Sequence, residues 1–424
     1  MAIGLAIAPL FTALHNPQSL LHAENILALS PIYWLLLDIL QLTYEADGLQ
    51  QKEVTTAFLS IGLFIVAMWL GTYRCTWSVP GRVTRLVCQE FSGITYFNLA
   101  ATAFVLSMLT FAIPCNFDLI TMFSYLGQSR WSAPWVRGQL GGMGAFVDQL
   151  QYFGYLLPSL TVIVAQLMGW LNRRTLLSMC MSVVVMAFIL QSGSRRIIGM
   201  MMGMALVIWI IRQKQVQPRH IVMGAVLAVS ILFSLELMLQ YRTVGLSVLS
   251  ERKEYDPLLE GNSIRVDDNF YRMCQIIELI PEHYSYTYEK YFIWIVVRPI
   301  PRILWPGKPI NPGFDLASVL GFKETSLTTS VIGELYMAAG LLGVTLGGWL
   351  YGRLAAMTTR LLAEGRTFGL LIIYGTMTMS LFNGMRSMVE LILMNYSTVA
   401  WIFLSWLFLS FRRSAESSVP ETAE

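Results

Sequence analysis

The sequence is poor in charged residues. Only 13% of its residues are Asp, Glu, Lys or Arg, whereas soluble globular domains carry about 25%. In contrast, 55% of the residues are hydrophobic, and the mean hydropathy is +0.57. This balance excludes a soluble domain. It predicts an all-α, polytopic integral membrane protein, because a helix satisfies its own backbone hydrogen bonds in lipid.

Cysteine and histidine are also scarce. The chain has five cysteines and four histidines, and they show no metal-ligand spacing. It has no HExxH motif, no glycine-rich phosphate loop, and no Asp-x-Asp pair in the segments that we place outside the membrane. Only His283 of the histidines falls clearly in such a segment. We therefore expect no metal and no other cofactor, and nothing indicates a nucleic-acid partner.

The long apolar runs predict ten or eleven membrane spans within one transmembrane domain, residues 1–424. The predicted spans are 26–44, 54–72, 94–114, 151–171, 175–192, 196–211, 221–240, 329–350, 367–384 and 388–411, with 2–14 as a short span or an interfacial segment. Two long segments, 115–150 and 241–328, interrupt the spans. The polar residues 414–424 predict a disordered tail.

Arginine and lysine in the short loops set the predicted orientation. Cytoplasmic loops carry an excess of these residues. With the spans above, one side of the membrane receives Arg74, Arg82, Arg85, Arg173, Arg174, Arg212, Lys214, Arg219, Arg353, Arg360, Arg366, Arg412 and Arg413. We take this side as the cytoplasm, so the C-terminus is cytoplasmic. The segments 115–150 and 241–328 then become extracytoplasmic loops.

Several arginines oppose this bias. Arg195, Arg196 and Arg386 lie in short turns that are predicted to face the outside. The longer outer segments add Arg130, Arg137, Arg242, Arg298, Arg302 and Lys308. Arginines on this side need a reason, such as a bound anion, a lipid headgroup or a paired carboxylate. A pyrophosphate suits them well, because guanidinium groups bind phosphate in a bidentate manner and helix starts also attract anions.

The long loop 241–328 has its own internal pattern. Residues 268–280 place apolar side chains at helical spacing and predict an amphipathic helix on the outer face. Residues 291–297 are apolar but too short to span the membrane. The next run, 298–309, contains four prolines and therefore cannot form a regular helix. This stiff run carries Arg298, Arg302 and Lys308.

Four carboxylates fall within predicted spans, each nearer to the outer end: Asp38, Glu236, Glu334 and Glu390. Ionisable residues inside a membrane are costly and usually face a partner or a cavity. Glu236 lies close enough to Arg242 for an ion pair. Glu334 has no cation nearby in its own span, and it is the main candidate for a functional carboxylate. In the loop, Asp267, Asp268, Glu282 and His283 are further candidates for proton transfer.

Several of these motifs resemble one family. The residues concerned are Arg298-Pro-Ile-Pro-Arg-Ile-Leu-Trp-Pro-Gly-Lys-Pro309, Thr329-Ser-Val-Ile-Gly-Glu-Leu-Tyr-Met-Ala-Ala-Gly-Leu-Leu-Gly343, Ser192-Gly-Ser-Arg-Arg196 and Leu239-Gln-Tyr-Arg-Thr-Val-Gly245. They resemble the oligosaccharide repeat-unit polymerases, the Wzy-type O-antigen and exopolysaccharide polymerases. The resemblance covers about residues 170–400.

The resemblance implies a GT-C-like glycosyltransferase of the bacterial inner membrane that acts at the periplasmic face. Its substrate would be an undecaprenyl-pyrophosphate-linked oligosaccharide, within membrane lipid. Its partners would be the flippase and the chain-length regulator of the same pathway. The expected pyrophosphate-binding residues are Arg195, Arg196, Arg242, Arg298, Arg302, Lys308 and Arg386. Glu334 is the expected catalytic carboxylate, with Glu282 and His283 behind it.

Two other functions compete with the polymerase. An O-antigen ligase uses the same donor and also needs outer cations, although the proline-rich run favours the polymerase. A flippase for a lipid-linked oligosaccharide belongs to another class. A transporter of that kind typically has repeated halves and polar residues near mid-membrane. In this sequence no repeat is evident, and the charged residues gather toward one face.

Overall fold

The computed structural model describes residues 1–42, 48–129, 131–135, 144–213, 226, 267–298, 300, 304–309, 311–322 and 327–417. All the regular elements in this part of the chain are helices, as the composition predicts. The elements are α1 (Ala2–His15), η1 (Pro17–Leu21), α2 (Ala23–Pro31), η2 (Ile32–Leu36), α3 (Leu37–Leu40), α4 (Gln51–Thr72), α5 (Gly81–Val87), α6 (Gly93–Ala112), α7 (Leu119–Ser124), η3 (Tyr125–Gly127), α8 (Gly144–Gln149), α9 (Gln151–Gly154), α10 (Leu157–Met168), α11 (Arg173–Gln191), α12 (Arg195–Ile211), α15 (Asn269–Leu279), α16 (Glu289–Val297), α17 (Leu316–Val319), α18 (Ser330–Glu364), α19 (Phe368–Gly384) and α20 (Met388–Ser417).

Within these described ranges, seven helical stretches are long and apolar enough to cross a membrane. They are Ala23–Leu40, Gln51–Thr72, Gly93–Ala112, Phe146–Met168, Arg173–Gln191, Ser330–Glu364 and Met388–Phe411. Two shorter apolar helices, α1 and α19, accompany them. The chain is thus a multi-pass helical membrane protein by length and composition. Apart from Val226, the predicted span 221–240 and the loop residues 241–266 lie outside the described residues.

Some predicted boundaries shift. The span predicted at 329–350 continues to Glu364, because residues 351–364 contain no proline, and the helix ends before Gly365. The span predicted from 151 begins earlier, within α8. Helix α20 continues to Ser417, so the tail expected from residue 414 begins with another turn of helix. An α-helix, α15, occupies the range predicted for an amphipathic helix.

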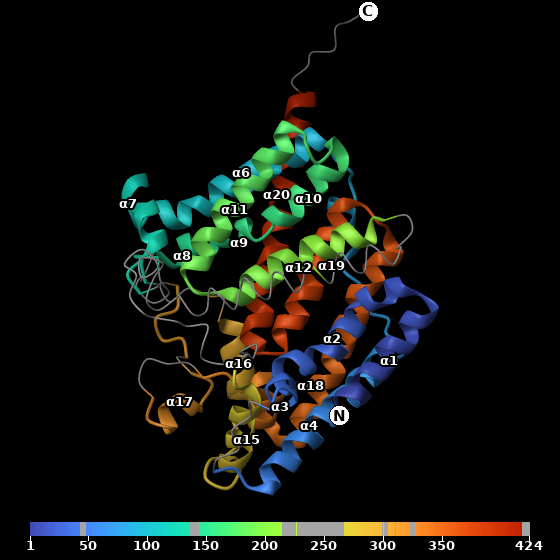
Figure 1. Cartoon of the computed structure of the whole chain (residues 1–424), viewed down its shortest axis with the longest axis vertical. Coiled ribbons are helices and arrows are strands. Elements are labelled where there is room, and N and C mark those ends of the chain that lie inside the picture. The colour runs from blue at the N-terminus through green and yellow to red at the C-terminus, as the bar shows by residue number, and fades with distance from the viewer. Residues whose placement is uncertain are drawn as a thin grey trace, which may run out of the picture.

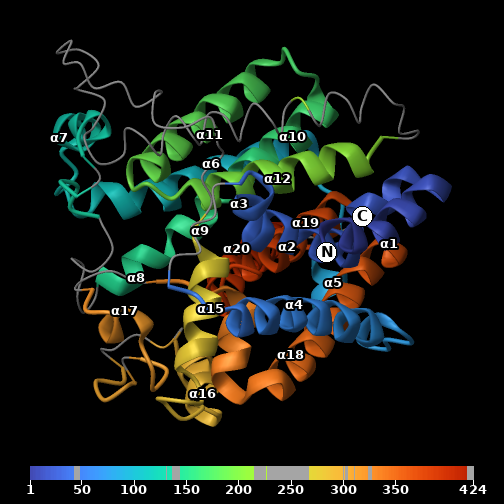
Figure 2. The same cartoon turned by 60° about the horizontal axis from the view of Figure 1, so that its bottom comes forward.

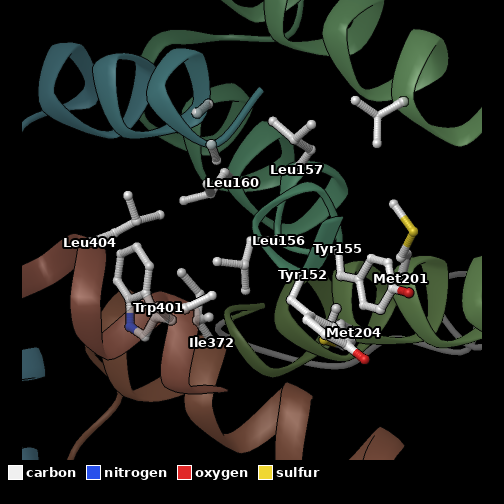
Figure 3. Packing of buried hydrophobic residues seen from close by; sticks show 14 of the residues in the cluster. Tyr152, Tyr155, Leu156, Leu157, Leu160, Met201, Met204, Ile372, Trp401 and Leu404 are labelled. Atoms are coloured by element: carbon white, nitrogen blue, oxygen red, sulfur yellow. The ribbon is translucent and has the colours of Figure 1, made fainter. Parts of the chain in front are cut away.

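Two buried hydrophobic clusters hold the helices together. The larger one joins α6, α9, α10, α12, α19 and α20, and Trp401 lies completely buried within it. Figure 3 shows Trp401 beside Leu404 and Ile372, with Leu156 and Leu160 facing them from the α9–α10 region. The smaller cluster joins α2, α4, α15 and α18. Helix α15 buries Phe270, Met273 and Ile277 in this second cluster, so its apolar face meets protein.

The bundle has two chemically different ends. Figure 2 shows α4, α6, α11 and α12 running nearly parallel, with α7, α8, α15, α16 and α17 at one end and α5 toward the other. Near α5, arginine side chains of one predicted cytoplasmic loop bond to another such loop. Arg353 donates to the carbonyl of Arg74, and Arg360 donates to that of Trp77. The segments predicted to share the cytoplasmic side therefore do meet at one end.

Helices α4 and α18 pack closely along glycines, and they lie side by side in Figures 1 and 2. A Cβ atom on Gly352 would lie 2.0 Å from the carbonyl oxygen of Met68, and one on Gly348 would lie 2.5 Å from that of Phe64. A Cβ on Gly71 of α4 would lie 2.2 Å from the carbonyl oxygen of Trp349. Small residues four apart allow helix backbones to touch in a membrane, where dispersion contacts drive association.

Helix α18 is broken near its start. Ala339 and Gly340 have non-helical backbone angles, and Gly340 has a φ of +60°, which favours glycine. The segment 287–288 completes the hydrogen bonding at the break, because the N–H of Thr287 donates to the carbonyl of Met337 and the N–H of Tyr288 donates to that of Ala338. The break therefore separates a short helix, which begins at Ser330, from the long helix that packs on α4.

We expect Gly352→Val to destabilise the protein by about 1–3 kcal/mol, because the new side chain would overlap a backbone atom that cannot move by itself. The thermal unfolding midpoint in detergent should fall. Gly62→Val, also in a membrane-spanning helix, is the matched control, since a Cβ there would meet nothing nearer than the Met1 side chain at 3.9 Å. Equal midpoints for the two variants would contradict close α4–α18 packing.

Candidate functional site

Three of the predicted arginines come together in an ion-pair cluster, which we define as Arg195, Arg196, Arg386, Asp267 and Glu390. Arg386 pairs with Asp267 and also donates to Glu390, with 3.4 Å between Nη1 and Oε1. Arg196 lies 2.9 Å from the same Glu390 oxygen, from its Nε atom. Arg195 lies 4.0 Å from Asp267. Three guanidinium groups thus face two carboxylates, so the cluster of ionised groups keeps one net positive charge.

The local sequence explains why the cluster forms. Arg195 and Arg196 open helix α12, where the exposed N–H groups already make the helix end positive. Two cations at this position repel the helix dipole and attract anions. Glu390 supplies an anion from the first turn of α20, a position where a carboxylate is favourable. Asp267, which precedes α15, supplies the second.

The ion pairs shift the pKa values of two members of the cluster, Asp267 and Arg386. Burial opposes ionisation of Asp267, but Arg386 and then Arg195 and Arg196 outweigh it and hold the pKa of this carboxyl below its ordinary value. Burial likewise opposes the charge on Arg386, but Asp267 and Glu390 raise the pKa of the guanidinium. The side chain of Arg386 is only 12% exposed. Each charge is therefore stabilised by the others, and loss of one leaves a buried partner unpaired.

Glu334 lies next to this cluster, in the short first part of α18. Its Oε1 accepts a hydrogen bond from the Ser387 hydroxyl at 2.6 Å. Its Oε2 accepts from the Tyr291 hydroxyl at 2.5 Å and from the backbone N–H of Met388 at 2.8 Å. Both carboxylate oxygens are thus engaged. Glu334 joins α16, the broken part of α18 and the first residue of α20.

Tyr291 and Ser387 complete this arrangement. Burial, followed by the neighbouring Glu334 carboxylate, raises the pKa of Tyr291 well above its ordinary value, so its hydroxyl stays protonated and donates. Ser387 precedes α20 and accepts from the N–H of Val389 at 3.2 Å while it donates to Glu334. It therefore caps the helix and anchors Glu334 at once. These contacts fix the turn between α19 and α20, which carries Arg386.

In the proline-rich run 298–309, Arg298 contacts an aromatic ring and Lys308 binds backbone carbonyls. Arg298 lies over the ring of Trp294, with its guanidinium carbon 4.6 Å from the ring centroid, and it is near enough to Tyr396 of α20 to act on it electrostatically. The Lys308 ammonium donates to the carbonyls of Arg298 and Ile300, each at 2.8 Å. Lys308 therefore closes the loop on itself. Arg302 and Arg242 lie outside the described residues.

The two loop candidates for proton transfer lie at the surface. Glu282 forms an ion pair with Lys52 at 2.6 Å. The hydrogen bond from Lys52, and then its charge, lower the pKa of Glu282, so this group does not favour taking a proton. His283 is exposed and follows α15. In the described part of the chain, neither side chain forms a hydrogen bond or an ion pair with the arginines of the ion-pair cluster.

The structure brings into the site several residues to which the sequence assigns no partner. From the sequence, Tyr291 is one of several aromatic residues in the outer segments and opens a short apolar segment, and Ser387 lies in a short predicted outer turn. Asp267 and Glu390 were candidates without an assigned partner. One signal was readable: Ser387 and Glu390 have the Ser-x-x-Glu spacing of a helix start. The pairing of Asp267 with Arg195 and Arg386 joins residues far apart in the chain, which no local pattern reveals.

Among the residues that the structure describes, no group of three or more His, Cys, Asp and Glu side chains could hold a metal ion. No protein-family model, curated protein or solved structure matches the chain. The functional interpretation therefore depends on the site itself and on the sequence motifs.

The ion-pair cluster predicts a pH dependence of stability. Because the folded-state pKa of Asp267 is lowered, its contribution is fully present above the unfolded value of about 4 and is lost as the pH falls through the folded value. The thermal midpoint in detergent should therefore drop in acid. Asp267→Asn should lower the free energy of unfolding at pH 7 by about 1–2 kcal/mol, and the thermal midpoint with it, since the carboxylate is partly solvated; the decline of the midpoint in acid should become shallower. An unchanged decline in acid in this variant would contradict the assignment.

Proposed function

We propose that this protein is a membrane glycosyltransferase that polymerises oligosaccharide repeat units carried on undecaprenyl pyrophosphate, at the periplasmic face of a bacterial inner membrane. The observation that carries the proposal is the ion-pair cluster. Arg195 and Arg196 from the start of α12 and Arg386 from the turn between α19 and α20 converge at the end of the bundle opposite the predicted cytoplasmic loops. Two of the runs that resemble the polymerase family contribute here: 192–196 supplies Arg195 and Arg196, and 329–343 supplies Glu334, which bonds to Ser387 and Met388 beside Arg386.

The chemistry of the donor explains why such a cluster is useful. In the transfer, the bond between the anomeric carbon and the pyrophosphate oxygen breaks, and its electron pair stays on the pyrophosphate. Fixed cations stabilise the charge that develops on this leaving group. A guanidinium has five N–H donors, so an arginine that holds a carboxylate can also bind a phosphate. In the proposal, Arg195, Arg196 and Arg386 bind the pyrophosphate, and Arg242, Arg298 and Arg302 extend the site.

Glu334 has a positioning role in this proposal. Its oxygens accept three hydrogen bonds, from Ser387, Tyr291 and the backbone of Met388, so the carboxylate is held in one orientation. It fixes Ser387 and the start of α20, and through them the turn that carries Arg386. Lys308 similarly holds the shape of the proline-rich run. The arginines then meet the substrate at low entropic cost, because their frame is already ordered.

The position of the charges also bears on the alternatives. Charged side chains of the site gather at the end of the bundle, on α12, α20 and the segment before α15. This arrangement favours chemistry at one face over transport across the membrane. The O-antigen ligase shares the donor, and the product distinguishes it from the polymerase.

The test is complementation of a strain that lacks the gene, with surface polysaccharide separated by length. Wild type should restore long chains. Arg195→Ala should reduce them by about tenfold or more, because one charge-assisted contact to the leaving group is lost. The product should then be single repeat units that remain attached to the carrier or to the lipid core.

Arg353→Ala is the matched control, since this arginine lies at the opposite end of the bundle, beside Trp349 and the carbonyl of Arg74. It should give normal chain lengths. Full-length chains from Arg195→Ala at wild-type protein abundance would reject the role of the cluster. Long chains that accumulate free of lipid A in the deletion strain would identify a ligase instead of a polymerase.

A further inference from the structure

The starting observation is a carboxylate oxygen without a partner inside the ion-pair cluster. Glu390 is nearly enclosed, with a side chain that is 6% exposed. Its Oε1 faces Arg196 and Arg386, whereas its Oε2 is buried and has no hydrogen-bond partner among the described residues. A buried acceptor without a donor destabilises the folded protein. Such groups are rare in folded proteins and call for an explanation.

Glu390 does not have the helix-capping role that its spacing from Ser387 predicts. Ser387 and Glu390 have the spacing of a capping box, in which the glutamate reaches back to the backbone N–H of the capping residue. Ser387 does cap α20 through its hydroxyl. The carboxylate of Glu390, however, turns to Arg196 and Arg386. The Asn383 amide nitrogen, which precedes the same turn, is a second buried polar group without a hydrogen-bond partner in the described part of the chain.

The surroundings of Oε2 define the donor that suits it. Two guanidinium groups on the other oxygen repel a further cation. A neutral O–H group carries no such cost and donates one hydrogen bond. A sugar hydroxyl is the O–H group that the proposed reaction brings to this place, because the pyrophosphate of the donor would lie on Arg196 and Arg386, next to Glu390.

We propose that Glu390 binds the attacking hydroxyl of the acceptor repeat unit through its Oε2 atom; this assignment rests on the proposed function. The hydroxyl oxygen forms the new bond to the anomeric carbon while the bond to the pyrophosphate breaks. The hydroxyl proton passes to Oε2 and then to water, and the electron pair of the broken bond stays on the pyrophosphate. The two arginines thus act on both reactants, by holding the leaving group and by orienting the carboxylate.

The test separates acceptor use from donor binding. Glu390→Gln keeps the shape and an oxygen for Arg196, but it places an N–H₂ group at one carboxylate position. Synthesis of polymer from lipid-linked repeat units, extracted from the deletion strain, should fall by about 100-fold, a typical effect of losing a proton acceptor. Farnesyl pyrophosphate is the probe for the donor site in nanodiscs. Its binding should be unchanged or tighter, because a nearby negative charge is removed.

Two further variants serve as controls for the two measurements. Arg195→Ala should weaken binding of farnesyl pyrophosphate by about tenfold or more. Glu53→Gln, on α4, changes another buried carboxylate that has an oxygen without a hydrogen-bond partner among the described residues. It should leave polymer synthesis and farnesyl pyrophosphate binding at the wild-type level.

Polymer synthesis at the wild-type level by Glu390→Gln would overturn the assignment. Loss of probe binding together with a lower thermal midpoint would also overturn it, since Glu390 would then only hold the cluster together. Failure of the wild-type protein to make polymer would instead reject the proposed function.

Discussion

The site depends on one buried guanidinium, that of Arg386. This side chain lies in the short turn between α19 and α20, and it bonds to Asp267 before α15 and to Glu390 on α20. A charge at this depth is costly unless it is paired on more than one side. The pairing therefore constrains three segments together: the turn itself, the start of α20 and the residues that lead into α15. Arg195 and Arg196 then bring the start of α12 to the same point.

The second constraint is backbone geometry, and it positions Glu334. Glycines at 348 and 352 allow α18 to lie directly on α4, and this contact anchors the long part of α18. The break at Ala339 and Gly340 frees the first part of the helix to take its own direction. Residues 287 and 288 satisfy the carbonyls that the break exposes. Glu334 is thereby delivered to the start of α20, where it supports the turn that holds Arg386.

The sequence could predict the class of fold and the presence of unusual arginines, because both depend on local composition and on charge position. The apolar runs predict helices, and Arg195, Arg196 and Arg386 stand out by opposing the bias of the short loops. The partners of these arginines were not predictable. Asp267 lies 72 residues from Arg195 and 119 residues from Arg386 in the chain, so only the folded structure shows which carboxylate meets which cation. The break in α18 has no local signature either, because Gly340 is one of several glycines in the apolar run 329–350 and the others lie in regular helix.

The paired state of the arginines also shapes how the site can work. Unpaired guanidinium groups would repel one another and resist burial. Asp267 and Glu390 offset this repulsion, so the arginines can lie close together before substrate binds. The ion pairs differ in length: Arg196 lies 2.9 Å from Glu390, whereas Arg195 lies 4.0 Å from Asp267. In the proposed reaction, a pyrophosphate on these arginines would lie beside the Glu390 oxygen that has no hydrogen-bond partner among the described residues.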